Sequence, residues 1–254
     1  MTLDPHLLNA IRFLTVVPTP RSTSTPQPDW LARAMKYFPL VGAGIGLASA
    51  LVFVVGCQIW SPPIAAILAV TASIVLTSAL HEDGLADTVD AFGGGWTVEK
   101  RLTIMKDSRI GTYGALALGL GCALRIAALA TLPIWAGAAA LIAVHAAARA
   151  MPAFVMNRLA YAGDTAAMKV SYAEAPVRRE EIAVLLMTAA LAAIPLVLVS
   201  FKSVMLGLLL GAVFGAMLAR WAKRLIGGYT GDVLGAIEQS FEIGFLLGVA
   251  AVLR

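Results

Sequence analysis

The sequence contains few charged residues: only 13% are Asp, Glu, Lys or Arg, whereas 59% of its 254 residues are hydrophobic. A soluble domain carries roughly a quarter charged residues, so a soluble fold is excluded. The apolar runs also lack the alternation of polar and apolar residues that membrane β-barrel strands require. The composition therefore predicts an all-α integral membrane protein, a polytopic bundle of membrane helices.

Cysteine is also scarce, and the two present, Cys57 and Cys122, both lie inside apolar runs. Two cysteines are too few for a disulfide framework or a zinc site, so we interpret both as small core residues. The net charge of +4 does not indicate nucleic-acid binding, because the basic residues follow a membrane pattern. We expect membrane lipid and small molecules as partners, but no nucleic acid, and leave open whether the chain forms a homo-oligomer.

Long apolar runs make up most of the chain. A membrane-spanning helix needs about 20 mostly apolar residues, and seven segments meet or nearly meet this length. They form one predicted integral membrane domain over residues 1–254. The predicted spans are 37–59, 63–80, 113–132, 134–157, 182–200, 203–222 and 236–253. In the sixth span, a four-residue spacing typical of closely packed membrane helices is formed by Gly207, Gly211 and Gly215.

The first 20 residues contain a shorter apolar stretch, which Pro18 and Pro20 end. No small-residue cleavage site follows this stretch, which argues against a signal peptide. We therefore expect an interfacial helix before the first span.

Lysine and arginine are distributed unevenly between the two sides of the predicted membrane. One side receives only Lys202 and Arg254. Most acidic residues lie on the opposite side, and the positive-inside rule makes that side cytoplasmic. We predict a multi-pass protein of the cell (inner) membrane with a cytoplasmic N-terminus and active site. The basic residues on the cytoplasmic side are Arg12, Arg21, Arg33, Lys36, Lys100, Arg101, Lys106, Arg109, Arg158, Lys169, Arg178, Arg179, Arg220, Lys223 and Arg224.

The run HEDGLADTVD, residues 81–90, places five ionisable side chains directly after the second predicted span. If that span continues as a helix, the carboxylates of Asp83, Asp87 and Asp90 fall within an arc of roughly 60°. Like charges at this spacing destabilise a helix, all the more beside a low-dielectric interior. A divalent cation would relieve the repulsion, and oxygen ligands favour Mg²⁺ or Mn²⁺ over zinc. The alternative is a solvated helix end.

The loop IMKDSRIGTYG, residues 104–114, mixes charges of both signs with glycine. Lys106 and Arg109 suit a diphosphate that bridges the metal, and Asp107 could add a metal ligand. The alternative is that these basic residues only set the membrane topology.

Three further charges, Arg125, His145 and Arg149, lie within predicted spans. Ionisable residues inside a membrane are costly and are functional candidates by default. His145 and Arg149 are four residues apart and share a helix face, which suits anion binding or an acid–base role for His145. Capping of a neighbouring helix, or snorkelling to the interface, is the alternative.

A second polar patch precedes the last span, in GGYTGDVLGAIEQSFE, residues 227–242. We expect it to form the far wall of the cavity whose near wall is the acidic run. Asp232 is a candidate base or metal ligand, although an ordinary helix N-cap explains it equally well. The polar residues of the patch are Tyr229, Thr230, Asp232, Glu238, Gln239 and Glu242.

Three motifs, HEDGLADTVDAFGGG, KDSRIGTYG and GGYTGDVLGAIEQ, resemble the cobalamin synthase family, the adenosylcobinamide-GDP ribazoletransferases. FLTVVPTP and YFPLVG near the front add to the resemblance, which runs from about residue 10 to 245. The resemblance implies a Mg²⁺-dependent membrane enzyme that joins adenosylcobinamide-GDP to α-ribazole or α-ribazole 5′-phosphate. GMP is released, and the product is adenosylcobalamin or its 5′-phosphate.

The resemblance also implies residue roles, carried over motif by motif. Asp83, Asp87 and Asp90 would bind the metal. Asp107 is a further candidate ligand from its place in the loop, not from the resemblance. The base that deprotonates the ribazole hydroxyl stays open among Glu82, Asp90, His145 and Asp232. The predicted substrate-binding residues are His81, Lys106, Arg109, Arg149, Tyr229, Glu238 and Gln239.

Two other function classes remain as alternatives. Membrane prenyltransferases also hold Mg²⁺-diphosphate on helical aspartates, but they carry two Asp-rich motifs, and Asp232 with Glu238 is a poor copy of the second. A cation or proton transporter predicts acids near the bilayer midplane and inverted repeats. The acids here gather at one face, and no repeat is visible.

Overall fold

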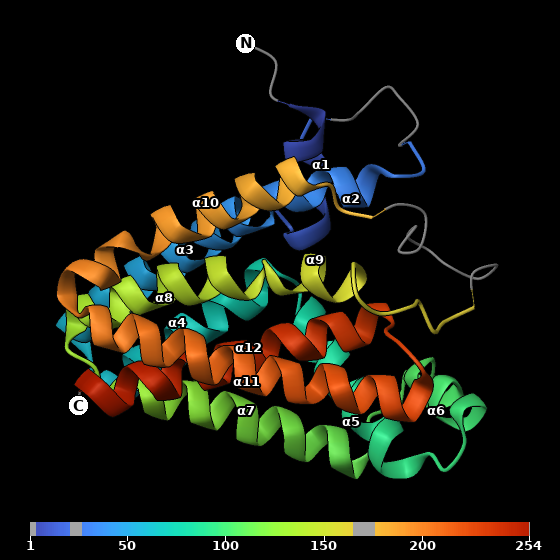
Figure 1. Cartoon of the computed structure of the whole chain (residues 1–254). Coiled ribbons are helices and arrows are strands. Elements are labelled where there is room, and N and C mark those ends of the chain that lie inside the picture. Colours follow the sequence, from blue (N-terminus) through green and yellow to red (C-terminus); the bar gives the residue numbers. More distant parts are fainter. Residues whose placement is uncertain (1–3, 21–26, 165–175, 254) are drawn as a thin grey trace.

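The structure is a computed structural model, and it describes residues 4–20, 27–164 and 176–253 (Figure 1). Arg21, Lys169 and Arg254, which entered the topology argument, lie outside the described residues. Within the described ranges the chain is helical, and the one β feature is an isolated bridge between Tyr161 and Tyr229. The prediction of an all-α fold is confirmed.

Twelve α-helices and one short 3₁₀-helix, η1, follow one another along the described residues. They are α1 (Pro5–Leu14), α2 (Trp30–Ala34), η1 (Met35–Tyr37), α3 (Phe38–Ile59), α4 (Pro62–Leu76), α5 (Leu80–Gly94), α6 (Val98–Met105), α7 (Thr112–Ala130), α8 (Ile134–Ala148), α9 (Met151–Met156), α10 (Arg179–Val199), α11 (Phe201–Ile226) and α12 (Gly231–Leu253).

Six helical segments in the described residues are long and apolar enough to cross a membrane, and α4 with α5 makes a seventh if that bent pair counts as one span. The predicted number of about seven agrees with this result. The chain is therefore a multi-pass membrane protein, and its segments are Trp30–Ile59, Thr112–Ala130, Ile134–Met156, Arg179–Val199, Phe201–Ile226 and Gly231–Leu253, beside the pair Pro62–Leu76 and Leu80–Gly94.

One sequence expectation is wrong: the second span does not continue as a helix into the acidic run. Ser78 and Ala79 have φ angles of 51° and 56°, in the left-handed region that residues with a side chain rarely adopt. The helix therefore breaks, and α5 turns 90° away from α4. The aspartates still share one helix, but that helix runs at 90° to α4 and does not continue it.

The helix α12 is central to the bundle and packs against α11, α5, α7 and α8. Against α11 the contact is close because glycines face each other: a Cβ on Gly248 would lie 2.7 Å from Cα of Gly207. Gly211 likewise contacts Phe241 of α12. The predicted close-packing face of the sixth span is thus confirmed.

The polar segments gather at one end of the bundle. Figure 1 shows α5 and α6 together at the end of the bundle opposite the C-terminus. The hydroxyl of Tyr37 donates to Asp4, the N-cap residue of α1, at 2.7 Å, which ties the N-terminal helix to the start of α3. The predicted N-terminal helix exists, and its interfacial position remains a prediction.

Candidate active site

The site begins where α5 crosses α12. A Cβ on Gly84 of α5 would lie 2.7 Å from the carbonyl oxygen of Asp232, and one on Gly235 of α12 would lie 3.2 Å from Cα of His81. Only glycine allows two backbones to approach this closely. The crossing therefore brings the beginning of the acidic run against the second polar patch, as the sequence predicted.

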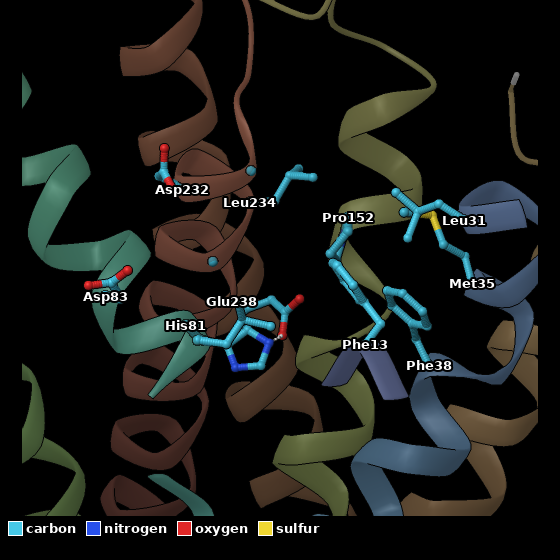
Figure 2. Close-up of a pocket in the computed structure, with 13 residues that line it drawn as sticks. Phe13, Leu31, Met35, Phe38, His81, Asp83, Pro152, Asp232, Leu234 and Glu238 are labelled. Atoms are coloured by element: carbon cyan, nitrogen blue, oxygen red, sulfur yellow. Dashed lines mark ion pairs between the residues drawn. The ribbon is translucent and has the colours of Figure 1, made fainter. Parts of the chain in front are cut away.

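A pocket with an empty volume of about 570 Å³ opens beside this crossing. Figure 2 shows its two walls, with the polar residues of α5 and α12 on one side and apolar residues of the N-terminal segments on the other. The polar wall is formed by His81, Asp83, Asp232 and Glu238. The apolar wall is formed by Phe13, Leu31, Met35, Phe38 and Pro152.

Three carboxylates at this crossing lack a positive counter-charge. Asp83 is exposed and Asp87 is half-buried, one helical turn apart on α5. Asp83, Asp232 and Asp90 all act on Asp87 with repulsive charge. Among the described residues, no lysine, arginine or histidine forms an ion pair with Asp83, Asp87 or Asp232. This repulsion would be relieved by a cation.

The four predicted metal ligands do not form one set. In the described part of the chain, no group of three or more His, Cys, Asp or Glu side chains is placed to hold a metal ion. Magnesium, however, is often held by one or two carboxylates, with water and substrate phosphate as the other ligands. Asp83 and Asp87, both carboxylates and both unpaired, fit such an ion, whereas Asp90 and Asp107 have other partners.

Asp90 caps the N-terminus of α7. One of its carboxylate oxygens accepts from the backbone N–H of Gly111 at 2.7 Å, and the other accepts from Gly114 at 2.8 Å. Glycine is required at both positions, since a Cβ there would collide with the Asp90 carboxylate. Both oxygens of Asp90 therefore help to order the α6–α7 loop, and its expected metal or base role remains a prediction.

Asp107 lies on that loop and pairs with Arg109 at 2.7 Å. The hydrogen bonds from Arg109 lower the pKa of Asp107 to about 2. Arg109 and Lys106 are exposed, and none of the three residues lines the pocket. The expectation that Asp107 joins the metal ligands is therefore not met, and the diphosphate contacts of Lys106 and Arg109 remain predictions.

Beneath the pocket, Arg125 of α7 connects two buried carboxylates on different helices. Its guanidinium lies 3.0 Å from Glu82 of α5 and 3.0 Å from Glu242 of α12. It also donates to the side-chain oxygens of Gln239, at 2.7 Å, and Ser73, at 3.3 Å. Glu82, a predicted base, and Gln239, a predicted substrate ligand, are thus occupied by an internal arginine.

Glu242 also pairs with two basic side chains, one from α8 and one from the residue that follows α8. Its Oε1 lies 2.8 Å from Nδ1 of His145 and 2.6 Å from the guanidinium of Arg149. These two side chains are buried and do not line the pocket, so their predicted catalytic and anion-binding roles do not fit their places. We call Glu82, Arg125, His145, Arg149 and Glu242 the buried ion network.

His81 and Glu238 connect the buried ion network to the pocket. Nε2 of His81 lies 3.0 Å from Oε2 of Glu238, and the same oxygen lies 3.9 Å from Nε of Arg149. Both residues line the pocket, and their substrate contacts remain predictions. Tyr229, also predicted to bind substrate, packs instead edge-on against Tyr161, with ring centroids 5.6 Å apart, and is not part of the lining.

Sequence reasoning missed the apolar wall of the pocket. Phe13 comes from α1 and Phe38 from the start of α3, inside the FLTVVPTP and YFPLVG stretches. Both stretches were noted for their resemblance to a family, but an aromatic residue in an apolar chain carries no signal that it faces a pocket.

Known proteins are similar to this chain over almost its whole length. A model of the cobalamin-5-phosphate synthase family matches residues 6–250. An adenosylcobinamide-GDP ribazoletransferase of Shewanella piezotolerans is 43% identical over 240 residues, which cover 93% of this chain and 91% of the relative. The enzyme of the same name from Bradyrhizobium diazoefficiens is 44% identical over 246 residues, covering 95% and 92%.

A third relative, the adenosylcobinamide-GDP ribazoletransferase of Leptothrix cholodnii, is 39% identical over 244 residues and covers 94% of this chain and 92% of its own. No solved structure matches the chain. None of these matches supports the prenyltransferase alternative. The family match and the relatives show that the chain belongs to the cobalamin-5-phosphate synthase family.

Proposed function

We propose that the chain is an adenosylcobinamide-GDP ribazoletransferase, which joins adenosylcobinamide-GDP to α-ribazole or its 5′-phosphate and releases GMP. The observation that carries this proposal is the pocket at the α5–α12 crossing, because two of the three motifs that resemble the family, HEDGLADTVDAFGGG and GGYTGDVLGAIEQ, meet there. Relatives at 38–44% identity over almost the whole chain carry that name.

The reaction is a displacement at phosphorus. A ribose hydroxyl of α-ribazole attacks the phosphorus nearer the corrinoid, and a new O–P bond forms. The bond from that phosphorus to the bridging oxygen breaks, and GMP leaves with the electron pair. Such a reaction needs positioning of both substrates, removal of the hydroxyl proton and stabilisation of negative charge on the phosphates.

The donor set proposed for the metal is Asp83 with Asp87, and the ion we propose is Mg²⁺. When bound, the ion would supply positive charge that stabilises the negative charge of the donor diphosphate. The support is that these two carboxylates lie one turn apart without a counter-charge, within the part of the chain that the family model matches. With only two protein ligands, the affinity for Mg²⁺ should depend on the diphosphate.

Among the four residues considered for the base, Asp232 is placed best. It lines the pocket, whereas Glu82 and His145 belong to the buried ion network and Asp90 caps α7. We propose that Asp232 accepts the proton of the ribose hydroxyl. Its hydrogen bond with the Thr230 hydroxyl, at 3.5 Å, is long and leaves the carboxylate available.

We also propose that the site faces the cytoplasm from the cell (inner) membrane. The support is the excess of lysine and arginine on the same side as the polar segments. Nucleotide-activated substrates are made in the cytoplasm, so this orientation gives the donor direct access.

The test is a GMP-release assay with the purified full-length protein, adenosylcobinamide-GDP, α-ribazole and Mg²⁺. We expect GMP to appear with adenosylcobalamin only when both ribazole and the metal are present. The Asp83→Asn variant should lose this activity, whereas Asp107→Asn, the same change in the exposed ion pair, should keep it. Release of GMP without ribazole, or full activity with a metal chelator, would contradict the proposal.

A further inference from the structure

We propose that the pocket is the binding site of the acceptor, a fused aromatic base on a ribose, with the base against the apolar wall and the ribose towards the polar wall. This inference rests on the proposed function and adds to it, because it assigns one of the two substrates to a place. No residue of the apolar wall was among the predicted site residues.

The size of the pocket favours the acceptor over the donor. The empty volume of about 570 Å³ includes space that is open to solvent, so it is an upper limit on what the pocket encloses. α-Ribazole, a ribose with a dimethylated benzimidazole, is a small molecule below this limit. The corrin macrocycle of adenosylcobinamide-GDP, with its peripheral amides and adenosyl group, is several times larger and must remain outside.

The apolar wall suits a flat, apolar base. The rings of Phe13 and Phe38 stack with centroids 5.8 Å apart and an interplanar angle of 19°, and Trp30 meets Phe13 edge-on at 5.9 Å. Phe13 is the partly exposed ring of this wall, and Leu31, Met35 and Phe38 are almost fully buried behind it. Aromatic side chains arranged in this way form a rigid surface for another aromatic ring.

The same wall disfavours the guanine of the donor. Guanine has several hydrogen-bond donors and acceptors on its edge, and each one costs free energy when it is buried without a partner. Phe13, Leu31, Met35 and Phe38 have no side-chain group that pairs with them. Dimethylbenzimidazole presents methyl groups and ring carbons at its edge, so the wall distinguishes the acceptor base from the donor base.

The polar wall offers carboxylates to the ribose. Asp83 is exposed, and Asp232 lines the same wall. Carboxylate oxygens accept hydrogen bonds from hydroxyl groups. The ring of His81 is 2% exposed, and its Nε2 lies 3.0 Å from Oε2 of Glu238.

The two walls together orient the acceptor for the proposed reaction. With the base against the apolar wall at Phe13, the ribose points towards Asp83 and Asp232 on the opposite side of the pocket (Figure 2). That is the side where we place the metal-bound diphosphate of the donor. The acceptor would therefore lie within the pocket, and the donor would approach along α5 from outside.

The first experiment measures the KM for each substrate separately. Phe13→Ala should raise the KM for α-ribazole about tenfold, because the base loses its aromatic contact, while the KM for adenosylcobinamide-GDP changes less than about twofold. Phe214→Ala is the matched control, since Phe214 is half-buried on α11 and does not line this pocket. It should change neither KM.

Two outcomes would overturn the inference. A rise in the KM for the donor alone would assign the pocket to the guanine nucleotide, and unchanged KM values for both substrates would show that the wall binds neither. If Phe13→Ala does not fold, Phe13→Leu keeps an apolar side chain and removes only the ring. It should still raise the ribazole KM, by a smaller factor.

A second measurement uses analogues of the acceptor base. The wild type should prefer α-ribazole over the corresponding α-riboside of adenine, and Met35→Gln should narrow this preference by giving the wall a polar group. The proposed function fails if the wild type forms no adenosylcobalamin. The further inference fails alone if the wild type is active but neither Phe13 nor Met35 affects the acceptor.

Discussion

Glu82 and Asp83 are neighbours on α5, yet their carboxylates lie in opposite electrostatic surroundings. Glu82 is buried and pairs with Arg125 at 3.0 Å, within a network that neutralises it. Asp83 is exposed to the pocket, and its charged neighbours, Asp87 and Asp232, are acids. A rotation of about 100° around the helix axis separates the two carboxylates. Glu82 supports the fold, whereas Asp83 lacks the positive charge that a bound cation would supply.

This comparison separates two kinds of acid that look alike in the sequence. A buried acid that is fully paired supports the fold, and removing its partner leaves a charge without compensation. An acid held among other acids is unfavourable for the fold and persists where function requires it. Activity and stability should therefore respond in opposite ways to changes at the two places.

The largest effect is expected at the pocket. Asp83→Asn should lower the rate of GMP release at least about a thousandfold, since the metal loses a ligand and charge on the phosphates is stabilised less. In the absence of metal, the same variant should melt at the same temperature as the wild type or higher, because repulsion with Asp87 is relieved. Rates and thermal melts in detergent check both parts. A lower melting temperature with unchanged activity would show that Asp83 supports the fold and not the reaction.

The next effect is expected in the buried ion network. Arg125→Met keeps the side-chain volume but leaves Glu82 and Glu242 without their shared cation. We expect the free energy of unfolding to fall by about 3–5 kcal/mol, measured by denaturant titration. Adding Glu82→Gln to this variant should recover part of the loss. If Arg125→Met is as stable as the wild type, the network does not support the fold.

A smaller effect is expected where α5 crosses α12. Gly84→Ala places a Cβ 2.7 Å from the carbonyl oxygen of Asp232, so the two helices must move apart. The expected cost is about 1–3 kcal/mol of stability, with a loss of activity because Asp83 and Asp232 separate. Gly119→Ala on α7 is the matched control, since nothing lies within 4 Å of its Cβ position. Equal behaviour of the two variants would contradict the close crossing.

The smallest effect is expected at Asp107. Since Arg109 lowers its pKa to about 2, this carboxylate is charged in both the folded and the unfolded protein at neutral pH. Any stability that the pair contributes is present above the ordinary pKa of an aspartate and is lost only as the pH falls towards 2. Asp107→Asn should therefore keep GMP release within about twofold between pH 6 and 9. A large loss of GMP release would show that Asp107 belongs to the active site.

Sequence reasoning found most of the fold because long apolar runs of this kind cross a membrane as helices. It failed at Ser78 and Ala79, where the chain adopts left-handed backbone angles that no residue preference announces. The 90° turn that follows depends on the packing of α5 against α12 and α7. Local patterns do not contain such tertiary contacts.

The candidate site was predicted in part, for a similar reason. The sequence showed that Asp83 and Asp87 share a helix and that a second polar patch faces them. It could not show that Asp90 caps α7, since the two glycines that donate to it come more than 20 residues later. Nor could it pair Glu82 with Arg125, which lies 43 residues away. Whether an acidic side chain is paired or unpaired therefore depends on residues that are distant in the sequence.

The central claim is that Asp83 and Asp87 hold a divalent cation together with the donor diphosphate. Electron paramagnetic resonance of Mn²⁺ tests it directly, on the full-length protein with adenosylcobinamide-GDP present and α-ribazole absent. We predict that the wild type and Asp107→Asn bind Mn²⁺, and that the double variant Asp83→Asn/Asp87→Asn leaves it free in solution. Equal Mn²⁺ affinity in the double variant and the wild type would contradict the account.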